Sequence, residues 1–70
     1  MHDDLKSAIQ AAFSAGYERA IAADDRLLTE TRKNHLDKSQ EYEKMAWIRL
    51  ATIPGEIGEA ARTELARIQQ

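Results

Sequence analysis

The sequence has no cysteine, a single proline and three isolated glycines among its 70 residues. Without cysteine, neither a disulfide nor a thiolate-bound metal can reinforce the fold. No apolar run approaches the roughly 18 residues of a membrane span. The acidic start, Met1–Asp4, leads into no run of signal-peptide type. We therefore expect a soluble, cytoplasmic protein that makes no membrane contact.

The sequence also lacks a large excess of either acidic or basic residues. The formal net charge is -2, and acidic and basic residues are interspersed along the chain. This is an ordinary solvated surface, and it argues mildly against a protein whose main task is to wrap nucleic acid. A chain of this length forms one domain, residues 1–70, whose core usually needs a disulfide, a metal or an oligomer. Because there is no cysteine, we expect a homodimer.

Recognisable catalytic or metal-binding arrangements are missing. Ser7, Ser14 and Ser39 have no histidine or acid in the pattern of a nucleophilic site. His35 has no metal-ligating neighbour three or four residues away, so we expect a solvated turn or helix residue there. The isolated glycines form no phosphate-binding loop. The sequence therefore predicts a protein that is not an enzyme and holds no cofactor or metal.

A helical stripe runs through the first half of the chain. Apolar and small residues recur there at steps of three and four, and Asp3 or Asp4 can cap the helix start. This pattern predicts a long helix over about 3–33. Within it, small residues recur every fourth position, so another helix can approach closely at Ala12, Gly16 and Ala20.

Residues 29–41 are strongly polar and contain neither glycine nor proline. Asn34 could end the first helix, and Asp37 or Ser39 could cap a second. We therefore predict a turn at about 34–38. The alternative is a continuous helix through this segment, because its residues are tolerable helix formers.

The densest apolar segment, residues 45–53, contains the only tryptophan and runs into Pro54 and Gly55. The proline stops a helix predicted over about 38–53, and a third helix is predicted over about 56–69. The fold class expected is all-α: a long N-terminal helix packs against an antiparallel arm that is broken at Pro54 and Gly55. We expect this helical hairpin to dimerise into a four-helix-like bundle.

The segment at 45–53 is apolar on nearly every side of a helix, so we expect its own chain on one side and a second chain on the other. Aromatic, methionine and arginine side chains are enriched where interfaces carry their binding energy. The candidate protein-binding residues are Tyr42, Met45, Trp47, Ile48 and Arg49. The candidate dimer or core residues are Phe13, Gly16, Tyr17, Ala20, Leu27, Leu50 and Ile53.

These features predict a small helical protein that binds a larger protein through an apolar and arginine-bearing helix face. It would act as an inhibitor or adaptor, and phage or mobile-element origin is plausible for a small acidic protein of this kind. The alternative is a helical binder of nucleotide or nucleic-acid phosphate. Positive charge that could contact phosphate gathers at Arg26, Arg32, Lys33 and Lys38, although acids lie among these residues.

A short resemblance bears on this alternative. Pro54 followed by Ala61, Thr63 and Leu65 resembles part of the hairpin of phage proteins that sequester cyclic nucleotide signals. The arginine-serine and tryptophan-asparagine parts of that hairpin are missing here. The resemblance implies a nucleotide sponge, a protein that sequesters nucleotide signals. A DNA-binding regulator is the other phosphate-binding alternative.

Overall fold

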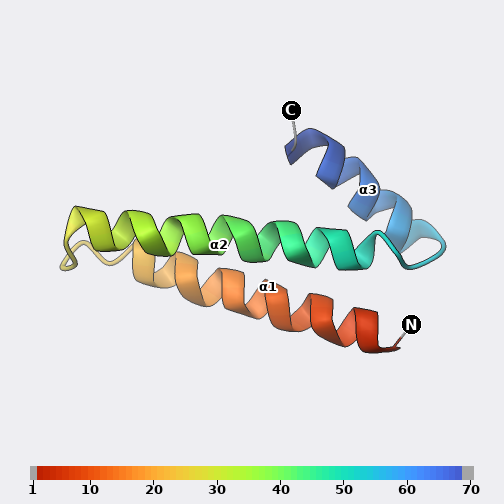
Figure 1. Ribbon diagram of the computed structural model, residues 1–70, viewed down its shortest axis with the longest axis horizontal. Helices are drawn as coiled ribbons and strands as arrows, with labels where there is room; N and C mark the ends of the chain where they lie inside the picture. Colours follow the sequence, from red (N-terminus) through yellow and green to blue (C-terminus); the bar gives the residue numbers. More distant parts are fainter. Residues whose placement is uncertain (1, 69–70) are drawn as a thin grey trace.

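The computed structural model describes residues 2–68 and contains three α-helices and no strand in that range. Helix α1 spans His2–Ala22, α2 spans Thr29–Leu50 and α3 spans Glu56–Ile68. Helices α1 and α2 form an antiparallel hairpin, and α3 turns back to pack against α2 but not α1 (Figure 1). The expected all-α class is confirmed.

The helices lie side by side in one layer, with α1 at one edge (Figure 1). The Cα trace measures 43 × 27 × 12 Å. Helix α3 packs against α2 and not against α1, so no helix of the described chain lies across the α1–α2 hairpin. The chain therefore has no second layer of its own under which to bury large side chains.

Small side chains form the seam between α1 and α2. Ala8, Ala11 and Ala15 of α1 are buried, as are Ser39 and Ala46 of α2. Their spacings of three, four and seven residues keep them on the facing sides of the two helices. Such side chains let the backbones approach closely, and larger apolar groups of α1, namely Leu5, Ile9, Phe13 and Tyr17, are exposed outside the seam.

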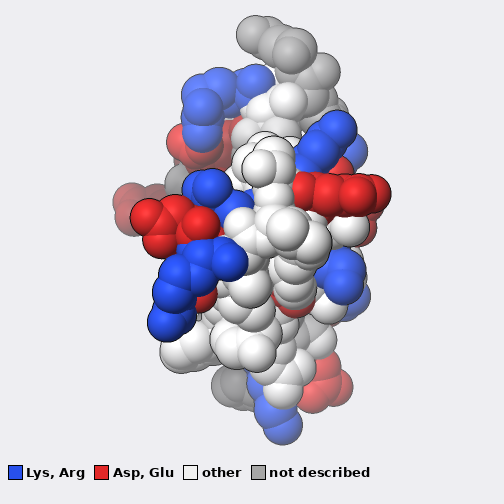
Figure 2. Space-filling model, turned by 90° about the vertical axis from the view of Figure 1, so that its left-hand side faces the viewer, with Lys and Arg blue, Asp and Glu red and all other residues white. Residues whose placement is uncertain are grey.

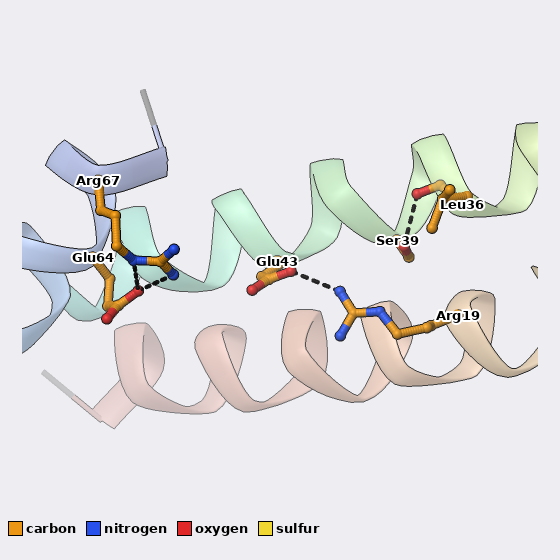
Figure 3. A network of polar contacts seen from close by, with 6 residues as sticks. All are labelled: Arg19, Leu36, Ser39, Glu43, Glu64 and Arg67. Atoms are coloured by element: carbon orange, nitrogen blue, oxygen red, sulfur yellow. Dashed lines mark hydrogen bonds and ion pairs between the residues drawn. The ribbon is translucent and has the colours of Figure 1, made fainter. Parts of the chain in front are cut away.

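The one fully buried polar side chain among the described residues is satisfied within its own helix. Ser39 Oγ donates a 2.7 Å hydrogen bond to the carbonyl oxygen of Leu36 (Figure 3). A hydroxyl that already has a partner can be buried without the cost of an unpaired group. Ser39 can therefore act as a small seam residue although it is polar.

The turn predicted at about 34–38 does not form, and α1 ends well before residue 33. The chain reverses at 23–28, and residues 29–41 belong to the continuous helix α2. Asp24 stops α1 because its carboxylate accepts the backbone N–H of Arg26 at 3.0 Å, which is an Asx turn. Adjacent acids are also unfavourable at a helix C-terminus. Arg32 Nε then donates to the Ala22 carbonyl at 2.9 Å and satisfies that helix end.

The predicted break at Pro54 and Gly55 does form. Helix α2 ends at Leu50, and Gly55 takes a φ of 93°, which favours glycine. A Cβ at Gly58 would lie 1.8 Å from the carbonyl oxygen of Ile53, so only glycine permits this close return. Arg62 also donates to the Ala51 carbonyl at 2.9 Å.

The prediction that a broken arm packs along a long first helix therefore needs correction. Helices α1 and α2 contain 21 and 22 residues, so α2 alone matches α1 in length. Helix α3 extends the layer beyond α2 and does not continue an arm along α1 (Figure 1). The last residue of the helix predicted over about 56–69 lies outside the described residues.

Candidate protein-interaction surface

The outer side of α1 carries a continuous apolar surface, which we call the Phe13 face. It consists of Leu5, Ile9, Ala12, Phe13, Gly16 and Tyr17. Phe13 is 76% exposed and Tyr17 is 69% exposed, although aromatic rings are among the side chains that gain most from burial. A shallow hollow of about 530 Å³ lies along this face. Nothing in the described part of the chain covers these rings.

A second apolar hollow, the Trp47 groove, lies beside this face between α1 and α2. Its main lining residues are Ala12, Gly16, Arg19, Glu43, Trp47 and Leu50. Ala12 and Gly16 border both the groove and the Phe13 face, so the two surfaces are continuous. Trp47 is only half-buried in it.

An ion pair bridges the two helices at this groove. Arg19 Nη2 lies 2.8 Å from Glu43 Oε2, with the side chains 56% and 39% exposed (Figure 3). At such exposure an ion pair contributes about 0 to 1 kcal/mol to stability. A second cross-helix pair joins Glu18 to His35. Both pairs connect the same two helices, so their main effect is to hold α1 and α2 in register.

His35 was predicted to be a solvated turn or helix residue, and the structure places it in a helix but not in full contact with solvent. It lies within α2, is partly buried, and contacts Glu18 across the seam. The sequence signal for this partial burial was the position of His35 four residues before Ser39 and seven before Tyr42, which places it on the seam side of the helix. Its partner could not be found from local sequence, because Glu18 lies 17 residues away.

The other side of the hairpin carries a smaller depression, the Arg49 hollow. Its main lining residues are Ser7, Gln10, Ser14, Tyr42, Met45 and Arg49. Met45 is exposed, Tyr42 and Arg49 are half-buried, and within residues 2–68 no ion pair involves Arg49. This depression therefore combines an aromatic ring, a thioether and a guanidinium that has no acid beside it.

The structure divides the candidate protein-binding residues between two sides of the layer. Tyr42, Met45 and Arg49 line the Arg49 hollow, whereas Trp47 lines the groove. Tyr42 and Trp47 are five positions apart and so point about 140° away from each other on the helix. Ile48 is exposed and borders neither depression. One partner helix cannot contact all five side chains at once.

The candidate dimer or core residues also differ from one another in burial. Phe13, Gly16, Tyr17 and Ala20 are exposed on α1, so they are not core residues of the single chain. Ile53 is buried, and Leu27 and Leu50 are half-buried. Local sequence missed that Leu5 and Ile9 would join the exposed set, because it did not show that Ala8, Ala11 and Ala15 take the inner side of α1.

Basic residues near the chain reversal form one more depression, the basic hollow. It is lined mainly by Arg19, Ala23, Thr29, Arg32, Lys33 and Leu36. Viewed from this end of the molecule, acidic and basic side chains are intermixed on both sides of an uncharged band (Figure 2). The local positive charge is therefore partly offset by neighbouring acids.

Two of the four basic residues singled out in the sequence lie outside this hollow. Arg26 bonds the Asp24 carboxylate through Nε at 2.9 Å and Nη2 at 2.8 Å, and Lys38 is exposed elsewhere on α2. The side-chain hydrogen bond from Arg26 lowers the pKa of Asp24 below its ordinary 3.8. The same bond raises the pKa of Arg26.

A similar local pair lies on α3, where Arg67 Nη2 is 2.6 Å from Glu64 Oε2 (Figure 3). This hydrogen bond raises the pKa of Arg67. The pair joins residues three positions apart on one exposed helix face, so it supports α3 itself and builds no site with α1 or α2.

Within residues 2–68, no group of three or more His, Cys, Asp or Glu side chains is placed to hold a metal ion. None of the described helices combines the length and the apolar content that crossing a bilayer requires. Comparison of the chain with protein-family models, with curated proteins and with solved structures finds no match.

Proposed function

We propose that this chain is a non-enzymatic helical interaction protein that binds a larger protein and acts as an inhibitor or adaptor. The observation that carries the proposal is the apolar surface left uncovered on the single-layer hairpin, which includes exposed Met45 and Ile48 at and beside the Arg49 hollow. Monomeric proteins rarely expose large contiguous apolar patches unless these bind something. The depressions are also open hollows and not enclosed pockets, which suits contact with another macromolecule.

The surface proposed for the larger protein is the Arg49 hollow together with exposed Ile48. Tyr42, Met45 and Arg49 are of the residue types that carry binding energy at interfaces. A carboxylate on the partner would give Arg49 the charged hydrogen bonds that it lacks within the described chain. Trp47 is left out of this surface because it lies in the groove on the other side.

The test is to capture partners from a lysate of the source cells, purify the captured protein and measure its dissociation constant directly. We expect a Met45→Ala, Arg49→Ala double variant to bind at least tenfold more weakly, a change of about 1.4 kcal/mol or more. Lys38→Ala, an exposed change on the same helix, is the matched control and should bind like the wild type. Equal affinities for the double variant and the wild type would exclude this surface.

We also propose that two hairpins associate into a four-helix-like bundle. What supports this is the single layer of helices, because stable domains bury their apolar faces between at least two layers. A second copy would cover this apolar surface without any further protein. Light scattering that shows a folded monomer throughout the micromolar range would contradict the association.

A second candidate function is the binding of nucleotide or nucleic-acid phosphate in the basic hollow. The observation that favours it is that Arg19, Arg32 and Lys33 all line this one depression. Phosphate contacts weaken steeply with salt. Binding of a fluorescent ATP analogue or a short fluorescent DNA duplex should then fall with ionic strength and on Lys33→Gln substitution. Absence of binding at low salt would eliminate this candidate.

A further inference from the structure

The exposed surface of the chain is larger than its mass predicts. A compact folded monomer of 7.9 kDa exposes about 4,400 Å² by the usual scaling, whereas this chain exposes 5332 Å². The excess is about 900 Å², close to the roughly 800 Å² that each partner contributes to a stable interface of standard size. The chain therefore exposes about as much surface beyond the expected amount as one such interface would bury.

Gly16 shows where another backbone would come closest. It lies in the interior of α1, where glycine costs about 1 kcal/mol relative to alanine. Its φ is not positive, and a Cβ added to it would meet nothing within 4 Å. Nothing inside the chain therefore requires glycine at this position, in contrast to Gly58.

The Phe13 face is also suited to contact its own copy. In a two-fold symmetric dimer the same patch is used twice, so a patch with a net charge would be pressed against a patch of the same charge. The six residues of this face include no acidic or basic side chain. The face itself therefore brings no like charges together, Glu18 and Arg19 lie at its borders, and each copy offers two large rings beside a glycine.

We propose that the Phe13 face is covered by a second copy of this chain, with the two α1 helices crossing antiparallel about a two-fold axis between Phe13 and Gly16. In this arrangement the Phe13 ring of each copy packs over Gly16 of the other, and Tyr17 packs over Ala12. The inference rests on the proposed bundle and names the face and the contact that form it. The Arg49 hollow is lined by none of the six residues of this face and stays the surface proposed for a larger partner.

Sedimentation analysis of full-length variants over a range of micromolar concentrations tests the proposal. The wild type should sediment with twice the monomer mass of 7.9 kDa. Phe13→Asp should sediment as a folded monomer, with helix content unchanged by circular dichroism because the ring is exposed. Leu28→Asp is the matched control, since Leu28 is 78% exposed but lies outside the face. It should remain dimeric like the wild type.

Gly16→Leu provides an independent variant if Phe13→Asp fails to fold. A leucine at this position has open space in the single chain, so the helices should form, but the second α1 could no longer approach. Its dimer dissociation constant should rise at least tenfold. If both variants dimerise as tightly as the wild type, the association stands and the Phe13 face is refuted. If the wild type itself is monomeric throughout, the bundle and this inference both fail.

Discussion

The substitution Ala15→Leu tests which side of α1 faces α2. Ala15 is 6% exposed and lies in the seam of small side chains. Leucine adds three carbon atoms to a side chain that is almost fully covered at the seam between α1 and α2. The helices must separate, or the side chain must leave its preferred rotamer, and such overpacking typically costs about 1 to 3 kcal/mol.

That cost is large for a chain of this size. At about 0.05 to 0.15 kcal/mol per residue, a domain of this length has a free energy of unfolding of about 4 to 10 kcal/mol. A loss of about 2 kcal/mol, with a urea dependence near 1 kcal/mol per molar, lowers the midpoint of unfolding by about 2 M. The shift is therefore well outside the error of a single titration.

Urea titration followed by far-UV circular dichroism, repeated at two protein concentrations, measures this shift. Ala20→Leu is the matched control, because it makes the same change on the same helix at an exposed position. At protein concentrations where the chain is monomeric its effect should stay within about 0.5 kcal/mol, because Ala20 shares the outer side of α1 with the proposed dimer contact. If Ala20→Leu destabilises the chain and Ala15→Leu does not, then the inner side of α1 is the stripe of Ala12, Gly16 and Ala20, and the seam described above is wrong.

Three further outcomes are expected. Leu28 precedes α2 without a side-chain capping bond, so Leu28→Asp should raise the free energy of unfolding by about 1 kcal/mol in urea titrations. Gly58→Ala should destabilise the chain by more than 1 kcal/mol and free α3 in hydrogen exchange, because its Cβ would overlap the Ile53 carbonyl oxygen. The pKa of Asp24 is lowered by Arg26, so its contribution to stability is complete above pH 3.8 and is lost as pH falls further. Asp24→Ala should accordingly lose less stability than the wild type between pH 5 and pH 2, and equal losses would contradict this.

Much of the fold follows from residues with strong local effects. The all-α class follows from the helical spacing of apolar residues, and the break before α3 follows from Pro54 and the positive φ of Gly55. These effects act within a few residues along the chain. They can therefore be read without knowing which helices meet.

The chain reversal and the inner side of α1 could not be predicted in the same way. The turn at 23–28 contains neither glycine nor proline and depends on Asp24 accepting the Arg26 N–H. The seam is built from alanine and Ser39, which carry little hydrophobic signal, while larger apolar residues such as Ile9 lie outside it. A search for the most apolar stripe therefore selects the outer side of α1.

For a related reason, the candidate interaction surface could be predicted only in part from the sequence. The spacing of the residues around Trp47 places them on more than one side of their helix, because helical angles follow from spacing alone. Which of them share a depression depends on the direction of α1, and that depends on the seam. Tyr42 and Arg49 therefore pair with Ser14 of α1, and Trp47 pairs with Gly16.

The central claim is that a second copy completes the single layer across the outer side of α1. An isotope-filtered NOE experiment on a mixed sample of ¹³C-labelled and unlabelled chains tests it most directly, because it detects only contacts between copies. The account predicts intermolecular NOEs from the Phe13 ring to the α-protons of Gly16. A dimeric sample whose intermolecular NOEs come instead from the Met45 methyl group, with none from Phe13, would contradict it.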